Sequence, residues 1–217
     1  MRVVITGTTA GIGREVAKMF VNLGHEVYGI DRLPKSFYHE NYHHIICDIT
    51  SKCELPHIED VDILINNAGT WYTNIDNIEV NLKGAIRCTK KYGLQPHIKA
   101  IVNVTSASAH SGAEFPEYVA SKGGLLAYTK WTALEVAKYG ATCNSISPGG
   151  VTTLSNKHIL ENPNLTDLVM KETMLNKWAS AKEIASWIYF VAVVNKSMTA
   201  QDILIDNGEM AKASFVW

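Results

Sequence analysis

The chain has 217 residues, of which 47% are hydrophobic and 19% charged, and its formal net charge is −1. This composition is typical of a globular protein, and the length fits one domain with a sizeable core. No Lys/Arg run is longer than Lys90-Lys91, which argues against the basic surface that nucleic acids or anionic membranes require. A small-molecule partner is therefore expected.

The chain opens with MRVVITG, in which the first apolar run covers residues 3–5 and is too short for the apolar region of a signal peptide. The densest apolar stretch, at 185–194, is shorter than the eighteen or so residues that a membrane span needs. We expect a cytoplasmic protein with no membrane partner.

Cysteine spacing gives no sign of a metal site or of disulfides. The four cysteines, none in a CxxC pair, are Cys47, Cys53, Cys88 and Cys143, and free buried thiols are expected. The densest group of possible ligands is His43, His44, Cys47, Cys53 and His57. Its spacing matches no zinc pattern, so no metal is predicted and the segment is interpreted as a buried strand with its flanking loops.

Short apolar runs alternate with longer segments of helical period, which is typical of a parallel sheet with helices on both faces. Seven strands are predicted, at 3–6, 26–31, 44–47, 62–66, 100–105, 142–147 and 202–206. Helices are predicted at 13–24, 78–94, 118–139 and 182–194. The fold class is thus an α/β doubly wound sheet, which residues 1–217 are expected to form as a single domain.

Two intervals differ from this regular alternation. Only residues 48–61 separate the third and fourth strands, so at most a short helix fits and one sheet face is expected to be thinly covered. The segment 154–178 is long and polar, with a weak apolar stripe at Leu165, Leu168, Val169 and Leu175. It is interpreted as a substrate lid, with an ordinary surface helix as the alternative.

The sequence TGTTAGIG places Gly7, Gly11 and Gly13 between the first strand and the first helix. Glycines there let the backbone approach a pyrophosphate, which the free N–H groups of the helix N-terminus stabilise. Thr9 and Ile12 belong to the same predicted cofactor-binding loop. Glycines that serve only to make a tight turn are the alternative.

Asp31 ends the second strand, where a carboxylate can accept hydrogen bonds from both ribose hydroxyls of an adenosine. A 2′-phosphate would meet like charge there. Arg32 follows and could bind that phosphate, but Asp31 would repel it and the glycine loop supplies no second cation. NAD is therefore predicted over NADP.

The sequence YVASK places Tyr118 four residues before Lys122. Random placement of the nine tyrosines and sixteen lysines in this chain gives about 0.7 such pairs. On a helix the two side chains would share one face, so the surrounding motifs decide whether the pair is functional.

Six motifs occur in one order: TGTTAGIG, NNAG (66–69), NLKG (81–84), IVNVTS (101–106), YVASK (118–122) and SPGGVTT (147–153). With them the chain resembles the short-chain dehydrogenase/reductase family, from Val3 to about Gly208. The resemblance implies a Rossmann fold and NAD(P)-dependent hydride transfer to or from an alcohol or ketone. It also implies a homodimer or homotetramer formed through the helices at 81–94 and 118–139.

The resemblance also implies roles for individual residues. Tyr118 would be the general acid/base, Lys122 its partner and a ligand of the nicotinamide ribose, Ser106 the hydroxyl that orients the carbonyl, and Asn81 the residue that positions a relay water. The remaining predicted cofactor ligands are Asn67, Ala68 and Gly69 near the adenosine ribose, Asp48 and Ile49 near the adenine, and Pro148, Gly149, Val151 and Thr153 near the nicotinamide. Simple capping of a helix or turn is the alternative for Asn81 and Asp48.

Physical arguments support this catalytic set. For Tyr118 to act as a base near neutral pH, its pKa must fall by about three from its usual value near 10, which costs roughly 4 kcal/mol. An ammonium about 4 Å away at an effective dielectric near 20 supplies about that much, so Lys122 is expected to lower the pKa of Tyr118. Ser106 can donate a hydrogen bond to the developing oxyanion.

One spacing departs from the family pattern. Ser106 lies twelve residues before Tyr118, one fewer than usual, whereas Thr105 has the usual spacing. Strand register favours Ser106, with Ser108 and Thr105 as alternatives.

A partly apolar substrate pocket is predicted around Trp71, Tyr72, Ala107, His110, Phe115, Pro116 and the segment from Leu154 onward. Two alternative functions stay open. One is an NADPH-dependent 3-oxoacyl-carrier-protein-type reductase, and the other is a non-catalytic nucleotide sensor with the same fold.

Overall fold

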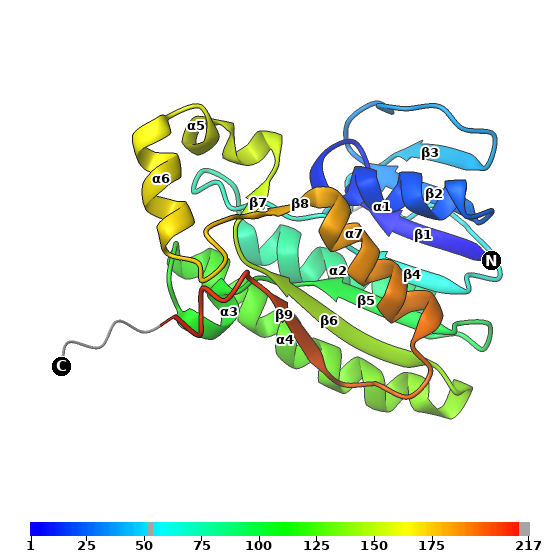
Figure 1. Cartoon of the computed structure of the whole chain (residues 1–217). Helices are drawn as coiled ribbons and strands as arrows, with labels where there is room; N and C mark the ends of the chain where they lie inside the picture. The colour runs from blue at the N-terminus through cyan, green and yellow to red at the C-terminus, as the bar shows by residue number, and fades with distance from the viewer. Residues whose placement is uncertain (52–53, 213–217) are drawn as a thin grey trace.

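The computed structural model describes residues 1–51 and 54–212. Seven strands, all paired in parallel, form one sheet in the order β3-β2-β1-β4-β5-β6-β9 (Figure 1). They are β1 Arg2–Thr6, β2 Glu26–Asp31, β3 Tyr42–Ile46, β4 Ile63–Asn66, β5 Ala100–Val104, β6 Thr142–Pro148 and β9 Asp202–Ile205. The predicted fold class is confirmed, and each predicted strand is found within two residues of its expected bounds.

Side chains alternate between two cores because successive residues of a strand point to opposite faces. On β1, Val3 and Ile5 belong to one buried cluster and Val4 to the other. Both faces of the sheet are therefore covered, which explains why its strands are near-continuous apolar runs.

Helices on both sides supply that cover (Figure 1). On one face α1 (Gly11–Asn22) packs against α7 (Ala181–Tyr189), and buried Val16 and Phe20 lie on the inward stripe of α1. On the other face α4 (Pro116–Val136) packs against the helical stretch 78–93. That stretch consists of the π-helical segments Ile78–Gly84 and Thr89–Gly93 on either side of α2 (Ala85–Cys88).

Shorter elements complete the chain. They are α3 Ser108–Ser111, α5 Lys157–Leu160, α6 Pro163–Lys171, the 3₁₀ turns Ala137–Tyr139 and Leu154–Asn156, the π-helical segment Phe190–Val194, and the strand pair β7 Val151–Thr152 with β8 Ala179–Ser180. Within the described residues no helix is both long and apolar enough to cross a membrane.

The interval between β3 and β4 contains no helix in its described residues, in line with the prediction of thin cover on one sheet face. Leu55 and Val61 fill part of that face, and the hydroxyl of Tyr92 donates a hydrogen bond to the Pro56 carbonyl at 2.8 Å.

The histidines and cysteines near this interval point to separate partners. His43 lies against Glu26, whereas His44 contacts Tyr42 and the Leu33 carbonyl. Cys53 lies outside the described residues. In the part of the chain that the structure describes, no group of three His, Cys, Asp or Glu side chains is arranged to hold a metal ion.

Two glycines bring α1 onto the sheet. A Cβ placed on Gly13 would lie only 2.1 Å from the Gly7 carbonyl oxygen, and Gly7 itself has φ +75°. The first turn of α1 therefore depends on the absence of a side chain at Gly13.

We expect Gly13→Ala to lower the free energy of unfolding by about 1–3 kcal/mol, because the added methyl overpacks this junction. Gly123→Ala on α4 is the matched control: its Cβ would meet nothing within 4 Å, and the change should stabilise by about 0.5–1 kcal/mol. Denaturant titration of both variants measures the contrast. Equal free energies of unfolding for the two variants would contradict the close contact between Gly13 and the Gly7 carbonyl.

Candidate active site

A cavity of about 820 Å³ lies at the carboxyl ends of the strands, where ligands bind in open α/β sheets. Its lining includes the glycine loop, the end of β2 and the first turns of α4. Every predicted site residue lines it except Gly13 and Asn81. The sheet thus brings five of the six motifs, all except NLKG, to one cavity.

The N-terminus of α1 faces this cavity with its first N–H groups uncapped. Ala10 is the N-cap and supplies no side-chain hydrogen bond. The side-chain amide of Asn67 donates to the carbonyls of Thr6 and Gly7, each at 3.0 Å, so Asn67 holds the turn in place. Free N–H groups and the helix dipole make this end suited to a pyrophosphate.

Asp31 lies beside the glycine loop. Its carboxylate accepts hydrogen bonds from the backbone N–H groups of Thr9, at 2.9 Å, and Leu33, at 3.0 Å. These two bonds fix the carboxylate at the edge of the cavity, next to Arg32. The predicted contact of this carboxylate with a ribose stays a prediction.

Asp48 and Ile49 also line the cavity, but both have structural partners. The Asp48 carboxylate accepts from the N–H and the hydroxyl of Thr50, at 2.8 and 2.7 Å, and these bonds lower its pKa. Asp48 therefore caps the following turn, the alternative considered from the sequence. Ile49 packs in the core, and its carbonyl accepts a hydrogen bond from Arg87 at 2.5 Å.

Helix α4 places Tyr118 and Lys122 on one face. Pro116 at the first helical position starts the helix after extended Phe115. The Lys122 ammonium donates to the Val104 carbonyl at 2.9 Å and lies 5.8 Å from the centroid of the Tyr118 ring. The pair predicted from spacing is therefore assembled within the cavity.

The protonation states differ from the expectation for this pair. Burial raises the pKa of Tyr118 to about 12 and lowers that of Lys122 to about 8. The expected fall of the Tyr118 pKa is not found, because burial outweighs the effects that favour the phenolate and the net shift is upward. The group that lowers the Tyr118 pKa is the hydrogen-bonding hydroxyl of Ser106.

The structure separates the three candidate hydroxyls. Ser106 interacts with Tyr118, and its Oγ lies 3.0 Å from Oγ of Ser108. Thr105 is directed elsewhere, toward the Ile146 carbonyl at 2.9 Å and the Ser147 hydroxyl at 2.7 Å. The position beside Tyr118 therefore belongs to Ser106, despite its unusual spacing.

Asn81 is buried inside the π-helical segment Ile78–Gly84 and does not cap a helix end. Its side chain accepts from the Thr70 N–H and donates to the Thr70 carbonyl, both at 2.8 Å, and donates to the Ser121 hydroxyl at 2.9 Å. It thus ties the loop after β4 to α4. π-Helical turns are frequent at functional sites, and the predicted role with a relay water stays a prediction.

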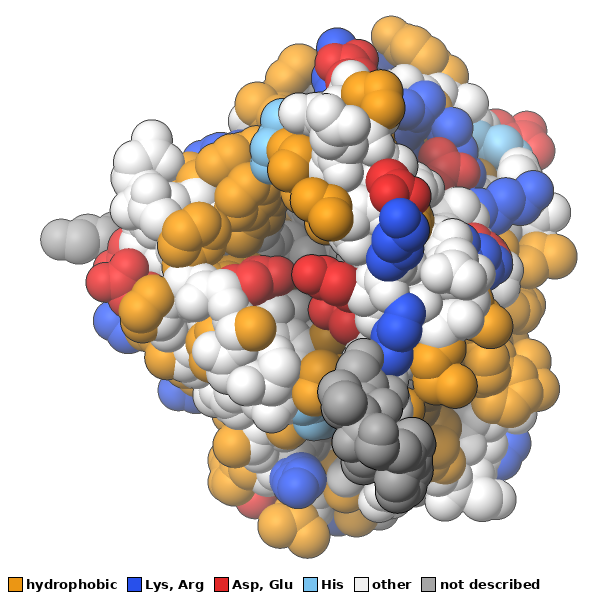
Figure 2. All heavy atoms as spheres, turned by 60° about the vertical axis from the view of Figure 1, so that its left-hand side comes forward, with side chains coloured by type: hydrophobic (Ala, Val, Ile, Leu, Met, Phe, Trp, Pro, Cys, Tyr) orange, Lys and Arg blue, Asp and Glu red, His pale blue; other side chains and the backbone are white. Residues whose placement is uncertain are grey.

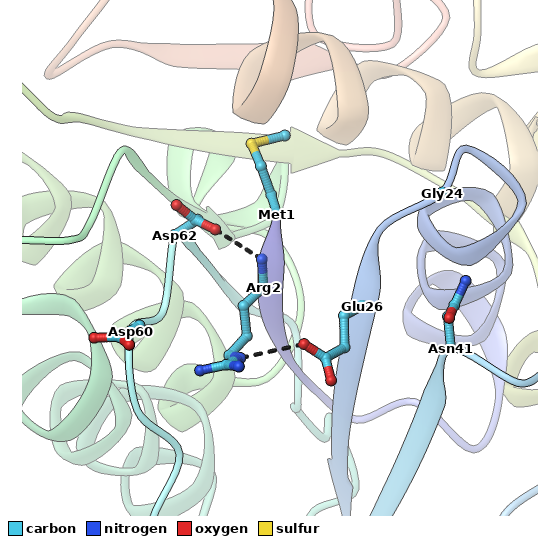
Figure 3. Close-up of a pocket in the computed structure, with 7 residues that line it drawn as sticks. All are labelled: Met1, Arg2, Gly24, Glu26, Asn41, Asp60 and Asp62. Carbon is cyan, nitrogen blue, oxygen red and sulfur yellow. Dashed lines mark hydrogen bonds and ion pairs between the residues drawn. The ribbon is translucent and has the colours of Figure 1, made fainter.

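A second hollow of about 360 Å³ lies at the opposite, amino-terminal end of the strands (Figure 3). Its charged side chains have partners within the hollow. Arg2 Nε lies 3.3 Å from the Glu26 carboxylate, and the Asp62 carboxylate accepts a hydrogen bond from the backbone N–H of Arg2 at 2.7 Å. These contacts tie β1, β2 and the start of β4 together. The charged residues of this hollow therefore stabilise the sheet, and the glycine loop is not among its lining residues.

Comparison with known proteins identifies the family. A family model described as enoyl-(acyl carrier protein) reductase matches residues 7–209. The chain is a short-chain dehydrogenase/reductase. It belongs to a family of NAD(P)-dependent oxidoreductases with the Rossmann fold.

Two curated relatives are 3-oxoacyl-[acyl-carrier-protein] reductases. The protein of Staphylococcus epidermidis is 31% identical over 163 residues, which cover 68% of this chain and 66% of the relative. The protein of Vibrio harveyi is 28% identical, with 95% of each chain covered.

Solved structures share the architecture. A short-chain dehydrogenase family protein from Francisella tularensis has a TM-score of 0.82 at 28% identity, covering 97% of this chain and 99% of that one. A 4-hydroxyisoleucine dehydrogenase complexed with NADH has a TM-score of 0.83 at 25% identity, covering 98% and 99%. ElxO with NADP bound has a TM-score of 0.84 at 25% identity, covering 97% and 99%.

The cavity of this short-chain dehydrogenase/reductase has an aromatic wall. Trp71 stacks on Phe115 at 6.1 Å and on His158 at 5.9 Å between ring centroids. Trp71, Ala107 and Phe115 line the cavity as predicted, whereas Tyr72, His110 and Pro116 do not. His110 instead binds Asp202 at 2.9 Å.

The segment 154–178 also lines the cavity, and its His158 belongs to the aromatic wall. Its lining residues are Ser155, Asn156, His158, Ile159, Val169, Glu172 and Trp178. Of the predicted apolar stripe only Val169 lines the cavity, while Leu168 and Leu175 are more than half exposed. The role of this segment as a lid stays a prediction.

Sequence reasoning missed Glu114, Glu172, Glu209 and Trp178, which all line the cavity. Figure 2 shows acidic side chains meeting across a hollow bordered by hydrophobic ones. The only local signal was that Glu114 lies between Ser106 and Tyr118. Burial raises the pKa of Glu114, and burial together with the neighbouring carboxylates raises that of Glu209.

The lowered pKa of Lys122 makes stability depend on pH with a defined sign. The pKa of Lys122 is about 8 in the folded protein and 10.5 ordinarily. Between these pH values the unfolded chain binds more protons at Lys122 than the folded protein does, so stability rises with pH. Measured relative to Lys122→Met, the unfolding free energy of the wild type should increase by about 2–3 kcal/mol across this window. Denaturant titrations at the two pH values test this.

Lys130→Met, which removes an exposed lysine from the same helix, is the control and should give no such slope. A wild-type advantage that is constant or falls with rising pH would contradict the burial of the Lys122 ammonium.

Proposed function

We propose that the protein transfers a hydride between NAD(H) and a secondary alcohol or ketone, with Tyr118, Lys122 and Ser106 at the reacting end. The observation that carries this proposal is the assembly of these three side chains in one cavity with the uncapped N-terminus of α1. The dinucleotide, when bound, supplies or accepts the hydride. The residues of this chain hold it, orient the substrate and move the proton.

In the reducing direction Ser106 donates a hydrogen bond to the substrate carbonyl oxygen, and Tyr118 gives that oxygen its proton as hydride reaches the carbon. In the oxidising direction the hydroxyl proton of the alcohol passes to the Tyr118 oxygen. The raised pKa of Tyr118, about 12, keeps the proton on the phenol at neutral pH, which suits the reducing direction. The buried Lys122 places positive charge beside the phenolate that forms.

The arrangement of Asp31 supports NAD as the preferred cofactor. Its carboxylate is fixed beside the glycine loop by two backbone N–H groups, where it can accept from a ribose diol and repels a 2′-phosphate. Homologous structures carry NADH or NADP, so the family leaves this choice to local residues.

We expect kcat/KM for NADH to exceed that for NADPH by at least tenfold, since one misplaced charge costs more than about 1.4 kcal/mol at short range. Asp31→Ser should reduce this ratio mainly by improving NADPH, and Asp48→Ser, at a turn-capping carboxylate, should not. A wild-type preference for NADPH would refute the assignment of Asp31.

Turnover is expected to depend on Tyr118. In a screen of ethyl acetoacetate, cyclohexanone and 1-phenylethanol with NADH or NAD⁺, Tyr118→Phe should reduce kcat by about 10²–10⁴-fold. Ser106→Ala should also reduce it strongly, while Thr105→Ala, which removes a hydroxyl directed away from Tyr118, should retain catalysis. Equal activity of the wild type and Tyr118→Phe would overturn the mechanism, and nucleotide binding without turnover of any compound would favour a sensor.

The relatives named as 3-oxoacyl-[acyl-carrier-protein] reductases favour a second candidate, an NADPH-dependent reductase of carrier-bound thioesters. Two features weigh against it in this chain. Asp31 opposes NADPH, and the carboxylates of Glu114, Glu172 and Glu209 at the cavity oppose the phosphate of a carrier arm.

We also propose that the protein is a homodimer or homotetramer formed through α4. Trp131 and Leu134 on this helix are 43% and 77% exposed, and burying such side chains stabilises association. Light scattering should report at least a dimer, which Leu134→Glu should dissociate. Leu165→Glu on α6, a matched change at a residue 40% exposed, should leave the assembly intact, and a monomeric wild type would contradict the proposal.

A further inference from the structure

We propose that Glu114 exchanges the proton of Tyr118 with solvent through the hydroxyls of Ser108 and Ser106. The inference rests on the proposed hydride transfer, because it assigns the path by which the acid/base residue of that reaction recovers or loses its proton.

The four side chains of the path line one cavity. Ser106 Oγ lies 3.0 Å from Ser108 Oγ. Ser106 lowers the pKa of Tyr118, and Ser108 lowers that of Glu114, so each hydroxyl acts on the titratable group at its own end of the path. Ser106 and Ser108 are 8% and 5% exposed. A hydroxyl both donates and accepts, so two buried hydroxyls in series can pass a proton between the phenol and the carboxylate.

Ser108 has no competing role at the start of α3. The N-cap of that helix is Ala107, and no side chain caps it. The Ser108 N–H donates to Ser106 Oγ at 3.2 Å, which keeps the two hydroxyls adjacent. The local backbone thus orders this pair without using the Ser108 hydroxyl as a cap.

Glu114 is held in an unusual conformation. Its φ is +86°, a region that residues other than glycine seldom adopt and that costs on the order of 1–3 kcal/mol. Its side chain lines the cavity and is exposed to solvent there. The strained backbone therefore presents a carboxyl group that both Ser108 and bulk water can reach.

Other polar side chains near Tyr118 have fixed partners. The Asn81 amide bonds to Thr70 and Ser121, and the Lys122 ammonium bonds to the Val104 carbonyl. Ser108, which lowers the pKa of Glu114, lies beside Ser106, which lowers that of Tyr118.

The charges around Glu114 set its proton affinity. Burial raises its pKa, while Lys122 on α4 and the bond to Ser108 lower it, and the net direction is upward. Tyr118 on the same helix and Glu209 after β9, itself next to Glu172, also face it. A carboxyl group with a raised pKa can hold a proton nearer to neutral pH.

The step is balanced in both directions. During reduction, hydride goes to the carbonyl carbon and the Tyr118 proton to its oxygen. The phenolate then takes the Ser106 proton, Ser106 takes that of Ser108, Ser108 takes that of the Glu114 carboxyl group, and solvent reprotonates the carboxylate. Oxidation runs the same path in reverse and needs Glu114 ionised at the start.

The direct test compares pH profiles of kcat for ethyl acetoacetate reduction and 1-phenylethanol oxidation. In the wild type, oxidation should fall as pH drops through the Glu114 pKa, and reduction should fall as pH rises through it. Glu114→Gln should slow both on the order of 10- to 100-fold and remove these limbs. Glu117→Gln, an equal charge change on an exposed residue outside the cavity, should keep the wild-type profile.

Two further variants separate a relay from a structural role. Ser108→Ala should reproduce the Glu114→Gln profile. The double variant should be no slower than either single variant, because each single change already blocks the same proton path. Formate or acetate should partly restore Glu114→Ala by delivering protons through the open cavity. A wild-type profile in Glu114→Gln, or losses that multiply in the double variant, would overturn the relay.

A measurement without substrate keeps the inference testable if none of these compounds is turned over. Tyrosinate absorbance, taken as the difference from Tyr118→Phe, follows the ionisation of Tyr118. Its pKa should decrease in Glu114→Gln, because the carboxylate raises it, and be unchanged in Glu117→Gln. An unchanged Tyr118 pKa in Glu114→Gln would overturn the coupling between Glu114 and Tyr118. Absence of wild-type turnover with a decreased Tyr118 pKa in Glu114→Gln would count against the proposed function and not against the coupling.

Discussion

The contact between the first strand and the first helix sets the geometry on which the site depends. Gly13 approaches the Gly7 carbonyl so closely that no Cβ fits, and Asn67 bonds to the same turn from the end of β4. Because the turn is tight, the N–H groups of α1 point into the cavity and Thr9 reaches the carboxylate of Asp31. One steric constraint thus positions both the N-terminus of α1 and the carboxylate of Asp31, the two features on which the proposed dinucleotide site rests.

Burial governs chemistry at the other end of the cavity. The low dielectric around Tyr118 and Lys122 disfavours the charged form of each, raising one pKa and lowering the other. A phenol that keeps its proton at neutral pH suits the proposed transfer of a proton to a ketone. The lowered pKa of Lys122 means that this ammonium loses its proton more readily than an exposed lysine does. The Lys122 ammonium donates a hydrogen bond to the Val104 carbonyl. This contact keeps the ammonium close to the Tyr118 ring.

The sheet and the location of the site were predictable because they follow from local patterns. Residues such as Val3 to Ile5 form apolar runs that only a doubly covered strand explains, and the motifs follow strands whose carboxyl ends share one edge. Matching IVNVTS to the family's strand also favoured Ser106 over Thr105, and the structure directs Thr105 toward the Ile146 carbonyl and the Ser147 hydroxyl. These inferences need no knowledge of distant contacts.

The rest depended on contacts that spacing cannot supply. The spacing of Tyr118 and Lys122 predicts that they share a helix face but not how deeply they are buried, and burial raises the Tyr118 pKa that was predicted to fall. Asp48 was left open because capping Thr50 and lining a cavity use the same carboxylate. Glu172, Glu209 and Trp178 come from segments without a motif and meet only after the chain folds.

Glu114 shows why a loop can carry chemistry that its sequence hides. Within the loop between α3 and α4, Gly112 and Glu114 both adopt positive φ. A glycine tolerates this freely, whereas a glutamate does so at a cost that the rest of the fold must offset. In this conformation the Glu114 side chain lines the cavity together with Ser108, whose hydroxyl lies 3.0 Å from that of Ser106. The loop conformation thus extends the proposed acid/base site from the buried phenol to the open side of the cavity.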